Sequence, residues 1–367
     1  MGYFQNIHLI NYRNFIKSSF DFHDGCNVII GKNGSGKTNI LESISLFEKG
    51  RGFRKEKIKN LINFKNQNIN FKVNSIFNHE KNNYNISVIN EINEEKYKKK
   101  ILINDSFDSD SIKNFEGLFS IIYFLPEMER LFLSSPLSRR NFIDRLIFSK
   151  DKKYNLVINN YKKNIQERQR ILKNPNYDSD WIDSIEDNIA SFGLEIYKKR
   201  IKHLEVINLE LKKLDYQKNF SKKIVLKIVD SLLVFNNKLF EIDFENYLTK
   251  LKINRKSDIF NGGCTIGPHR SDFAGFEIDS SFNVNQYSTG QQKTVILQII
   301  LAHCNFMINH NLKPVILLDE ICSHLDADNR ELLLYLSEQI NMQIFMTGTE
   351  KNLFSFLSTK TKYCNIT

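Results

Sequence analysis

The chain has 367 residues, a formal net charge of +10 at pH 7 and a hydrophobic share of 41%. This length allows a large buried core and a second lobe, and the positive balance favours a polyanionic partner. Five scattered cysteines without metal-site spacing favour a reducing compartment, so we expect a cytoplasmic protein. The sequence carries no recognisable signal peptide and no apolar run of membrane-spanning length, which argues against a secreted or membrane-embedded class.

A phosphate-binding motif comes first along the chain. The apolar run Cys26–Ile30 predicts a buried strand, and helical spacing of apolar residues follows the motif. Between them lies a full match to G-x-x-x-x-G-K-[ST], which predicts an ATP site at Gly31, Lys32, Asn33, Gly34, Ser35, Gly36, Lys37 and Thr38. We expect Lys37 to reach the β- and γ-phosphates and Thr38 to ligate Mg²⁺. A glycine-rich turn without a ligand fits this strand–helix setting less well.

The long middle part of the chain predicts first strands and then helices. Alternating apolar residues between 68 and 90, among them Ile69, Phe71 and Val73, predict antiparallel strands beside the ATP site. Ile121–Leu125 predicts a further strand that ends at Pro126. From about 138 to 215 the spacing predicts two long helices joined near Asn174–Asn176. Such a pair makes an αα-hairpin arm.

Basic residues gather at several points of this region. Three groups stand out: Arg51, Arg54, Lys55, Lys57 and Lys59 after the first helix, Lys98–Lys100, and Arg139, Arg140 and Arg145. Each group is either an ordinary solvated face or a contact to nucleic acid. Because aromatic and basic residues are not interleaved as in single-strand stacking modules, we expect contacts to the backbone of duplex or junction DNA.

Two further motifs lie near the C-terminus. Ser288, Gly290 and Gln291 open a predicted helix, and the apolar strand Val315–Leu318 ends at Asp319 and Glu320. We expect Asp319 to hold Mg²⁺ and Glu320 to orient or deprotonate the attacking water, so that Glu320, Asp319 and Lys37 are the catalytic residues. The short pattern at Ser288 alone also fits an N-capped core helix. Its position before the acidic strand resembles the signature of ABC-type ATPases, and Ser323–Asp326 resembles their D-loop.

This resemblance has two structural consequences. An ABC-type signature completes the site of the opposite subunit. One phosphate-binding motif (the cradle, Gly31–Thr38) and one signature per chain therefore predict an ATP-dependent homodimer. About 250 residues separate Lys37 from Ser288, too many for a compact transporter domain, and heptad repeats of a long coiled coil are absent. We therefore expect an α/β fold: an ABC-type P-loop ATPase head (1–125 and 256–367) with an inserted, mostly helical arm or lobe II (126–255).

The sequence as a whole resembles the RecF family of bacterial recombination mediators. The string Gly267-Pro268-His269-Arg270 is the most specific, because ATPase motifs are shared widely. Glu127 and Thr347–Thr349, which depart from the general ABC pattern, also suit this family, whereas Ser271 stands where the family usually has an acidic residue. The remaining matches are Asn11–Phe15, Gly31–Asn39, Ser138–Arg145, Gly290–Gln292, Asp319–Glu320 and Glu350.

The resemblance implies a weak, DNA-stimulated ATPase without nuclease or helicase activity. It implies a role in recombinational repair, replication restart and the SOS response, with dimerisation at gapped or junction DNA and help to RecR and RecO in loading RecA. The alternative is the ATPase component of a nuclease-coupled system of the overcoming-lysogenisation-defect type. Such proteins add a carboxylate-rich metal domain after the ATPase, and we expect none in this sequence. We assign no catalytic role to His269.

Overall fold

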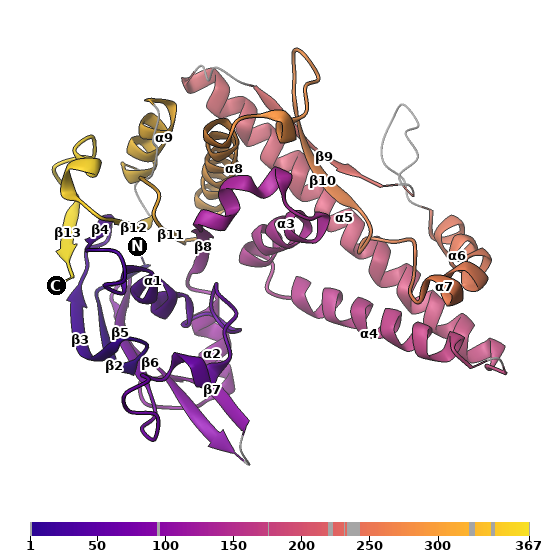
Figure 1. The fold of residues 1–367 in the computed structure, drawn as a ribbon, viewed down its shortest axis with the longest axis horizontal. Helices are drawn as coiled ribbons and strands as arrows, with labels where there is room; N and C mark the ends of the chain where they lie inside the picture. Colours follow the sequence, from indigo (N-terminus) through magenta and orange to yellow (C-terminus); the bar gives the residue numbers. More distant parts are fainter. Residues whose placement is uncertain are drawn as a thin grey trace. The chain divides into compact units, whose positions relative to one another are not determined.

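The computed structural model describes residues 2–93, 96–174, 176–218, 223–230, 232, 243–322, 327–338 and 342–366. The chain divides into two compact units, unit 1 (1–129 and 296–367) and unit 2 (130–295), whose elements are labelled in Figure 1. The boundaries expected after residues 125 and 255 therefore lie after Glu129 and Val295. The second one moves because strand β10 (Asp272–Glu277) pairs with β9 (Ile224–Val229), which keeps residues 256–295 with unit 2.

Unit 1 contains a parallel sheet that is buried on both faces. Its strands β4 (Cys26–Ile30), β8 (Ser120–Phe124), β11 (Pro314–Leu318) and β12 (Gln343–Gly348) consist of buried residues throughout, as expected for apolar runs. Neighbouring strands are parallel along the whole order, so their carboxyl ends share one edge. The order is β13 (Lys362–Asn365), β4 (Cys26–Ile30), β12 (Gln343–Gly348), β11 (Pro314–Leu318) and β8 (Ser120–Phe124).

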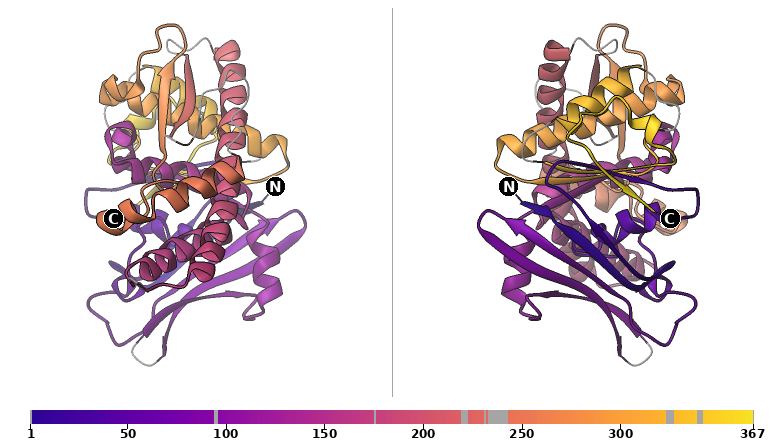
Figure 2. Two further views of the ribbon diagram at one scale, coloured as in Figure 1. Left: turned by 90° about the vertical axis from the view of Figure 1, so that its right-hand side faces the viewer. Right: turned by 90° about the vertical axis from the view of Figure 1, so that its left-hand side faces the viewer.

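An antiparallel sheet forms the other layer of unit 1, seen most openly in Figure 2. It confirms the predicted antiparallel strands, although Ile69 lies before β5 (Lys72–His79) and is 58% exposed. The reason is local: Asn11 donates to the carbonyls of Asn66 and Ile69 and holds this segment as a loop. The order is β3 (Phe15–Asp21), β2 (Asn6–Tyr12), β5 (Lys72–His79), β6 (Asn82–Asn93) and β7 (Lys96–Ile103), with β1 (Gly2–Phe4) paired to β5.

Helix α1 (Lys37–Ser45) connects the two layers of unit 1 through its apolar side chains. Ile40, Leu41 and Ile44 are fully buried in one cluster with residues of both sheets, such as Leu9 and Leu317. Each fully buried aliphatic side chain contributes about 1.5–3 kcal/mol, so the start of α1 is fixed firmly. The smaller elements of unit 1 are η1 (Ile58–Leu61), α2 (Ser109–Glu116), α9 (Ala327–Ser337) and η4 (Lys351–Phe354).

Unit 2 is mostly helical and contains the predicted hairpin arm. Helices α4 (Tyr154–Leu172) and α5 (Ser179–Lys218) pack against each other, and α3 (Pro136–Lys150) precedes them. The apolar residues whose spacing predicts these helices belong to the core, since Tyr161, Ile182 and Ile189 are buried. The arm is followed by the two-stranded sheet β9–β10 and by short helices. These are α6 (Phe244–Ile253), α7 (Arg255–Asn261) and η3 (Val284–Gln286), while η2 (Pro126–Leu133) and α8 (Thr289–Asn309) span the unit boundaries.

Candidate nucleotide-binding site

The phosphate-binding motif forms the loop between β4 and α1. Gly34 and Gly36 have φ values of 83° and 106°, a left-handed region that suits glycine. Gly36 is also closely approached, because a Cβ there would lie 2.6 Å from Asn14 Nδ2 and 2.7 Å from Phe15 Cζ. Both backbone shape and space therefore require glycine at position 36, and the loop ends at the helix N-terminus as the sequence predicts.

Lys37 lies inside this loop. Its side chain is buried, and Nζ donates to the carbonyl oxygens of Gly31 and Lys32 at 2.8 and 3.0 Å. These partners are neutral, and Lys37 forms no ion pair with another residue that the structure describes. An ammonium group that is held only by backbone carbonyls can exchange them for phosphate oxygens without breaking a salt bridge.

The acidic strand β11 brings Asp319 to the same edge of the sheet. Thr38 Oγ1 donates to Asp319 Oδ1 at 3.1 Å, which joins two predicted Mg²⁺ ligands from distant parts of the sequence. Asp319 is buried, and its backbone N–H donates to the carbonyl of Phe124 on β8 at 2.9 Å. The contact follows from the topology, because β4 and β11 both flank β12 and end at one edge.

Thr347, at the end of β12, connects the two acidic residues. Its fully buried hydroxyl donates to Asp319 Oδ1 at 2.7 Å and accepts from the Glu320 backbone N–H at 2.8 Å. Glu320 itself is exposed and has a φ of 48°, a left-handed conformation that is unusual for a residue other than glycine. In the sequence Thr347 marked only a departure from the ABC pattern; the structure makes it part of the site.

Thr38 and Asp319 are suitable residues for holding Mg²⁺. The ion prefers hard oxygen ligands and is usually bound by one or two protein groups, with phosphate oxygens and water completing its shell. A hydroxyl and a carboxylate oxygen 3.1 Å apart at the mouth of a phosphate-binding loop provide this donor set.

An ion pair that the sequence did not reveal supports the base of α1. The carboxylate of Glu42 is fully buried and accepts from Arg13 Nε and Nη2 at 2.8 and 2.7 Å and from the Tyr12 hydroxyl at 3.0 Å. Two parallel N–H···O bonds of this kind fix geometry as well as charge. The available signal was the string Tyr12–Asn14, which contributed only to the family resemblance.

The signature residues adopt the geometry of a helix cap. Ser288 Oγ accepts from the Gln291 backbone N–H at 3.3 Å, and Gln291 Oε1 accepts from the Ser288 N–H at 3.0 Å. This reciprocal pair is a capping box at the start of α8. It is the alternative considered for the pattern and is compatible with a second role toward a partner. The predicted D-loop, Ser323–Asp326, lies outside the described residues.

The basic groups fall into two classes. Arg51, Arg54 and Lys55 are exposed, and Arg54 also lies 3.8 Å from Glu42 Oε2 and donates to Asn39 Oδ1 at 2.9 Å. In unit 2, Arg139 forms a bidentate ion pair with Asp272, both bonds being 2.7 Å, and Arg140 donates to the Ser271 carbonyl at 2.5 Å.

These contacts give the two arginines a structural role in unit 2. Arg139 and Arg140 hold the start of β10, because each donates to an acceptor there. Their assignment as DNA contacts stays a prediction. The second basic group is also not uniform: Lys99 Nζ donates to the carbonyl of Leu46 at 2.8 Å, and burial lowers its pKa to about 8.

The glycine–proline–histidine–arginine string is a structural element of unit 2. Gly267 has a φ of 117°, and a Cβ there would lie 2.2 Å from the Tyr247 hydroxyl and 2.5 Å from that of Tyr161. The ring nitrogens of His269 contact the Tyr161 hydroxyl at 2.7 Å and the Cys264 carbonyl at 2.9 Å, and burial lowers its pKa. Both ring nitrogens of His269 therefore hold neighbouring segments of unit 2 together.

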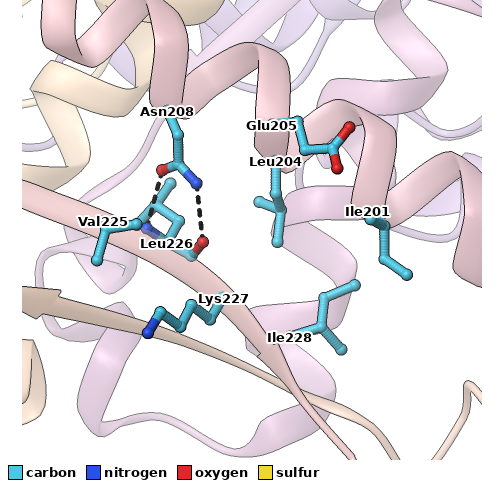
Figure 3. A pocket seen from close by; sticks show the side chains of 8 residues that line it. All are labelled: Ile201, Leu204, Glu205, Asn208, Val225, Leu226, Lys227 and Ile228. Atoms are coloured by element: carbon cyan, nitrogen blue, oxygen red, sulfur yellow. Dashed lines mark hydrogen bonds between the residues drawn. The ribbon is translucent and has the colours of Figure 1, made fainter. Parts of the chain in front are cut away.

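Unit 2 also contains a mainly apolar pocket of about 370 Å³ between α5 and β9, shown in Figure 3. The Asn208 amide is bound to the backbone of β9: its Nδ2 donates to the Leu226 carbonyl and its Oδ1 accepts from the Leu226 N–H, both at 2.9 Å. The other polar residues are Glu205 and Lys227, which do not form a convergent set for phosphate chemistry. The lining residues are Ile201, Leu204, Glu205, Asn208, Val225, Leu226, Lys227 and Ile228.

Known proteins resemble the chain over nearly its full length. The family model for the RecF/RecN/SMC N terminal domain matches residues 3–364. The chain is 32% identical to the DNA replication and repair protein RecF of Clostridium novyi, covering 95% of this chain and 93% of the relative. It is 28% identical to that of Brucella suis biovar 1, covering 99% and 94%.

Solved structures agree with these matches. A structure of the recombination mediator protein RecF with ATPrS in the RecFOR pathway superposes with a TM-score of 0.82 at 27% identity, covering 97% of this chain and 94% of the other. An Smc head bound to the C-winged helix domain of ScpA shares the fold, with a TM-score of 0.55 at 16% identity and coverages of 97% and 92%. Across the described residues, no helix combines the length and apolar character of a membrane span. The chain belongs to the RecF family, within the wider RecF/RecN/SMC group of ABC-type ATPase heads.

Proposed function

We propose that this chain is an ATP-dependent DNA-binding protein of cytoplasmic recombinational repair and replication restart. The observation that carries the proposal is the 3.1 Å contact between Thr38 and Asp319 beside the phosphate loop. With the neighbouring Lys37 ammonium, this contact gives a hydroxyl, a carboxylate and a cation at one edge of a parallel sheet. These are the groups that a nucleoside triphosphatase uses to bind Mg²⁺ and phosphate. Membership of the RecF family, in which a solved relative is described with ATP, supports ATP as the ligand.

Each residue of the site has a distinct task in this proposal. Lys37 exchanges its two carbonyl partners for phosphate oxygens, and the backbone N–H groups of the loop hold the remaining phosphate charge. Thr38 and Asp319 would hold Mg²⁺, which neutralises charge on the phosphates when bound. Glu320 orients or deprotonates the attacking water, and Thr347 fixes its backbone.

The decisive experiment is ATP turnover over a series of protein concentrations, with and without gapped duplex DNA. Because one chain supplies one cradle and one signature, we expect a slow rate per chain that rises with protein concentration and is stimulated by DNA. Analytical ultracentrifugation of Glu320→Gln should show a dimer at saturating ATP. A rate per chain that is indifferent to both concentration and DNA would remove the dimer mechanism.

Complementation between two inactive variants tests the composite site directly. Lys37→Met inactivates the cradle, and Ser288→Arg inactivates the proposed signature of Ser288, Gly290 and Gln291. A heterodimer of the two variants retains one intact composite site, so an equimolar mixture should recover about a quarter of the wild-type rate. If Ser288 only caps α8 in its own chain, the mixture stays as inactive as the separate variants.

We propose that Arg51 and Lys55, with Arg54, contact the DNA backbone. Arg51 and Lys55 are exposed, so their charge reversal should leave the fold intact. The variant Arg51→Glu/Lys55→Glu should bind duplex DNA more weakly and reduce the slope of log affinity against log salt by about 2. The matched control is Lys162→Glu/Lys163→Glu on the exposed side of α4, which should leave the slope unchanged.

The family supplies the proposal for partners. A relative is described as a recombination mediator in the RecFOR pathway, so we propose that this chain acts with RecR and RecO at gapped or junction DNA to load RecA. Filament assembly by RecA on gapped DNA, measured with RecR and RecO and with or without this chain, tests it. Assembly that is no faster with the chain present, while ATP turnover is normal, would limit the function to ATP-dependent DNA binding.

A further inference from the structure

The turn between β2 and β3 contacts the phosphate loop through one side chain. Asn14 lies in this turn, and its Nδ2 donates to the carbonyl oxygen of Ser35 at 2.9 Å. The side chain also lies against Gly36, where an added Cβ would come within 2.7 Å of Asn14 Oδ1. Asn14 therefore contacts the loop at the peptide group that joins Ser35 to Gly36.

Holding the Ser35 carbonyl determines where the next N–H points. The peptide group is planar and trans, so the Gly36 N–H is directed opposite to the Ser35 carbonyl. Because Asn14 binds the carbonyl side of this peptide, the Gly36 N–H points away from Asn14. Backbone N–H groups directed into such a loop are the donors that bind phosphate.

A chain of side chains fixes which way the Asn14 amide is turned. Arg54 Nη1 donates to Asn39 Oδ1 at 2.9 Å, and Asn39 Nδ2 donates to Asn14 Oδ1 at 2.8 Å. Arginine can only donate, so the Asn39 oxygen must face Arg54 and its NH₂ must face Asn14. The Asn14 NH₂ must then face Ser35. The cation therefore gives both amides a single orientation.

We propose that Asn14 is a positioning residue of the phosphate loop and that Asn39 and Arg54 act through it. This inference rests on the proposed function of the loop as an ATP site. In it, Asn14 presets the Gly36 N–H toward the phosphates before ATP arrives, which lowers the cost of ordering the loop on binding. The Asn14 side chain is exposed, so its role concerns the loop rather than the core.

Equilibrium ATP affinity in the presence of Mg²⁺ tests the inference. Asn14→Leu has a similar size and no charge but cannot donate, and we expect ATP to bind about fivefold to tenfold more weakly, with an unchanged unfolding temperature. Asn14→His places a ring N–H at the same distance along the side chain and should recover most of the affinity at pH 8. Asn78→Leu, on β5 of the same sheet, is the matched control and should bind as the wild type does.

A double-mutant cycle separates positioning from general stability. If Asn39 acts through Asn14, Asn39→Leu weakens ATP binding in the wild type but adds little to Asn14→Leu. Arg54→Met should behave in the same way, and these two variants also serve if Asn14→Leu does not fold. Wild-type affinity in all three variants, or additive losses, would overturn the inference. Failure of the ATP site itself is distinguishable, because the wild type would then bind ATP no better than Lys37→Met.

Discussion

Buried charged side chains are neutralised differently in the arm of unit 2 and in the candidate nucleotide site of unit 1. In unit 2, Arg168 is 1% exposed and lies between Glu186 and Asp258, with N···O distances of 2.8 and 2.6 Å. In unit 1, Lys37 and Asp319 are each 4% exposed, yet their hydrogen bonds go to carbonyls and hydroxyls, and neither forms an ion pair with another described residue.

The difference separates charges that hold the fold from charges that await a ligand. A buried ion costs several kcal/mol unless an opposite charge and hydrogen bonds compensate it. The Arg168 cluster is complete without further groups, and its loss should affect stability alone. Lys37 and Asp319 have neutral partners instead. Bound phosphate groups would supply the negative charge for Lys37, and a divalent cation would supply the positive charge for Asp319.

Removing the central cation of unit 2 should have the largest effect on stability. Arg168→Met leaves the buried carboxylate of Asp258 without its ion-pair partner and weakens that of Glu186. We expect a loss of about 3–5 kcal/mol in the free energy of unfolding, measured with denaturant. Arg170→Met, on the same helix, removes an exposed pair with Glu167 at 3.5 Å and should cost less than about 1 kcal/mol. Equal losses in the two variants would mean that burial does not distinguish these charges.

Removing the cation of the phosphate loop should lower activity and leave stability almost unchanged. Lys37→Met deletes a buried charge that has only carbonyl partners, so we expect the free energy of unfolding to stay within about 1 kcal/mol of the wild type. ATP turnover should fall about 100-fold or more, because the charge that develops on the phosphates loses its partner. A variant that unfolds readily would place Lys37 with the structural charges and refute the comparison.

The two kinds of charge were not equally visible in the sequence. The loop residues follow a contiguous pattern, and the strands on both sides are apolar runs, so Lys37, Thr38 and the end of β11 could be predicted. Thr347 and Asn14 could not be assigned, because their roles arise from contacts between segments far apart in the chain. Ion pairs such as Arg139–Asp272 were missed for the same reason, and the arginine was interpreted as a surface charge.

The boundary of the arm shows a similar limit. The periodicity of apolar residues predicts where helices such as α4 and α5 lie. It does not predict which strands pair with one another. The pairing of β10 with β9 depends on register between residues more than forty positions apart, such as Asp272 and Val229. It was this pairing that moved the end of unit 2 beyond the expected position.

Acid should introduce a buried positive charge into unit 2. Burial, with a smaller contribution from Lys150, lowers the pKa of His203 from 6.5 to about 3. Between these values the unfolded chain binds a proton that the folded chain does not, so the free energy of unfolding falls as pH drops from 6.5 toward 3. We expect this residue to account for about 2–3 kcal/mol of the loss between pH 7 and pH 4. His203→Gln should show a shallower pH dependence over this range; an identical dependence would mean that another group causes it.

The smallest expected effect concerns Thr347, one of the neutral hydroxyl partners of Asp319. Thr347→Val removes the hydroxyl that bonds Asp319 and the Glu320 N–H, and we expect a loss of about 1 kcal/mol in stability. Turnover should fall more, about tenfold, because the left-handed conformation of Glu320 is strained and depends on such contacts. Thr347→Ser keeps the hydroxyl and should retain most of the rate. If valine and serine give equal rates, Glu320 is positioned by ATP and its partner subunit rather than by the strand edge, and the site is less preorganised than the contacts of Asp319 indicate.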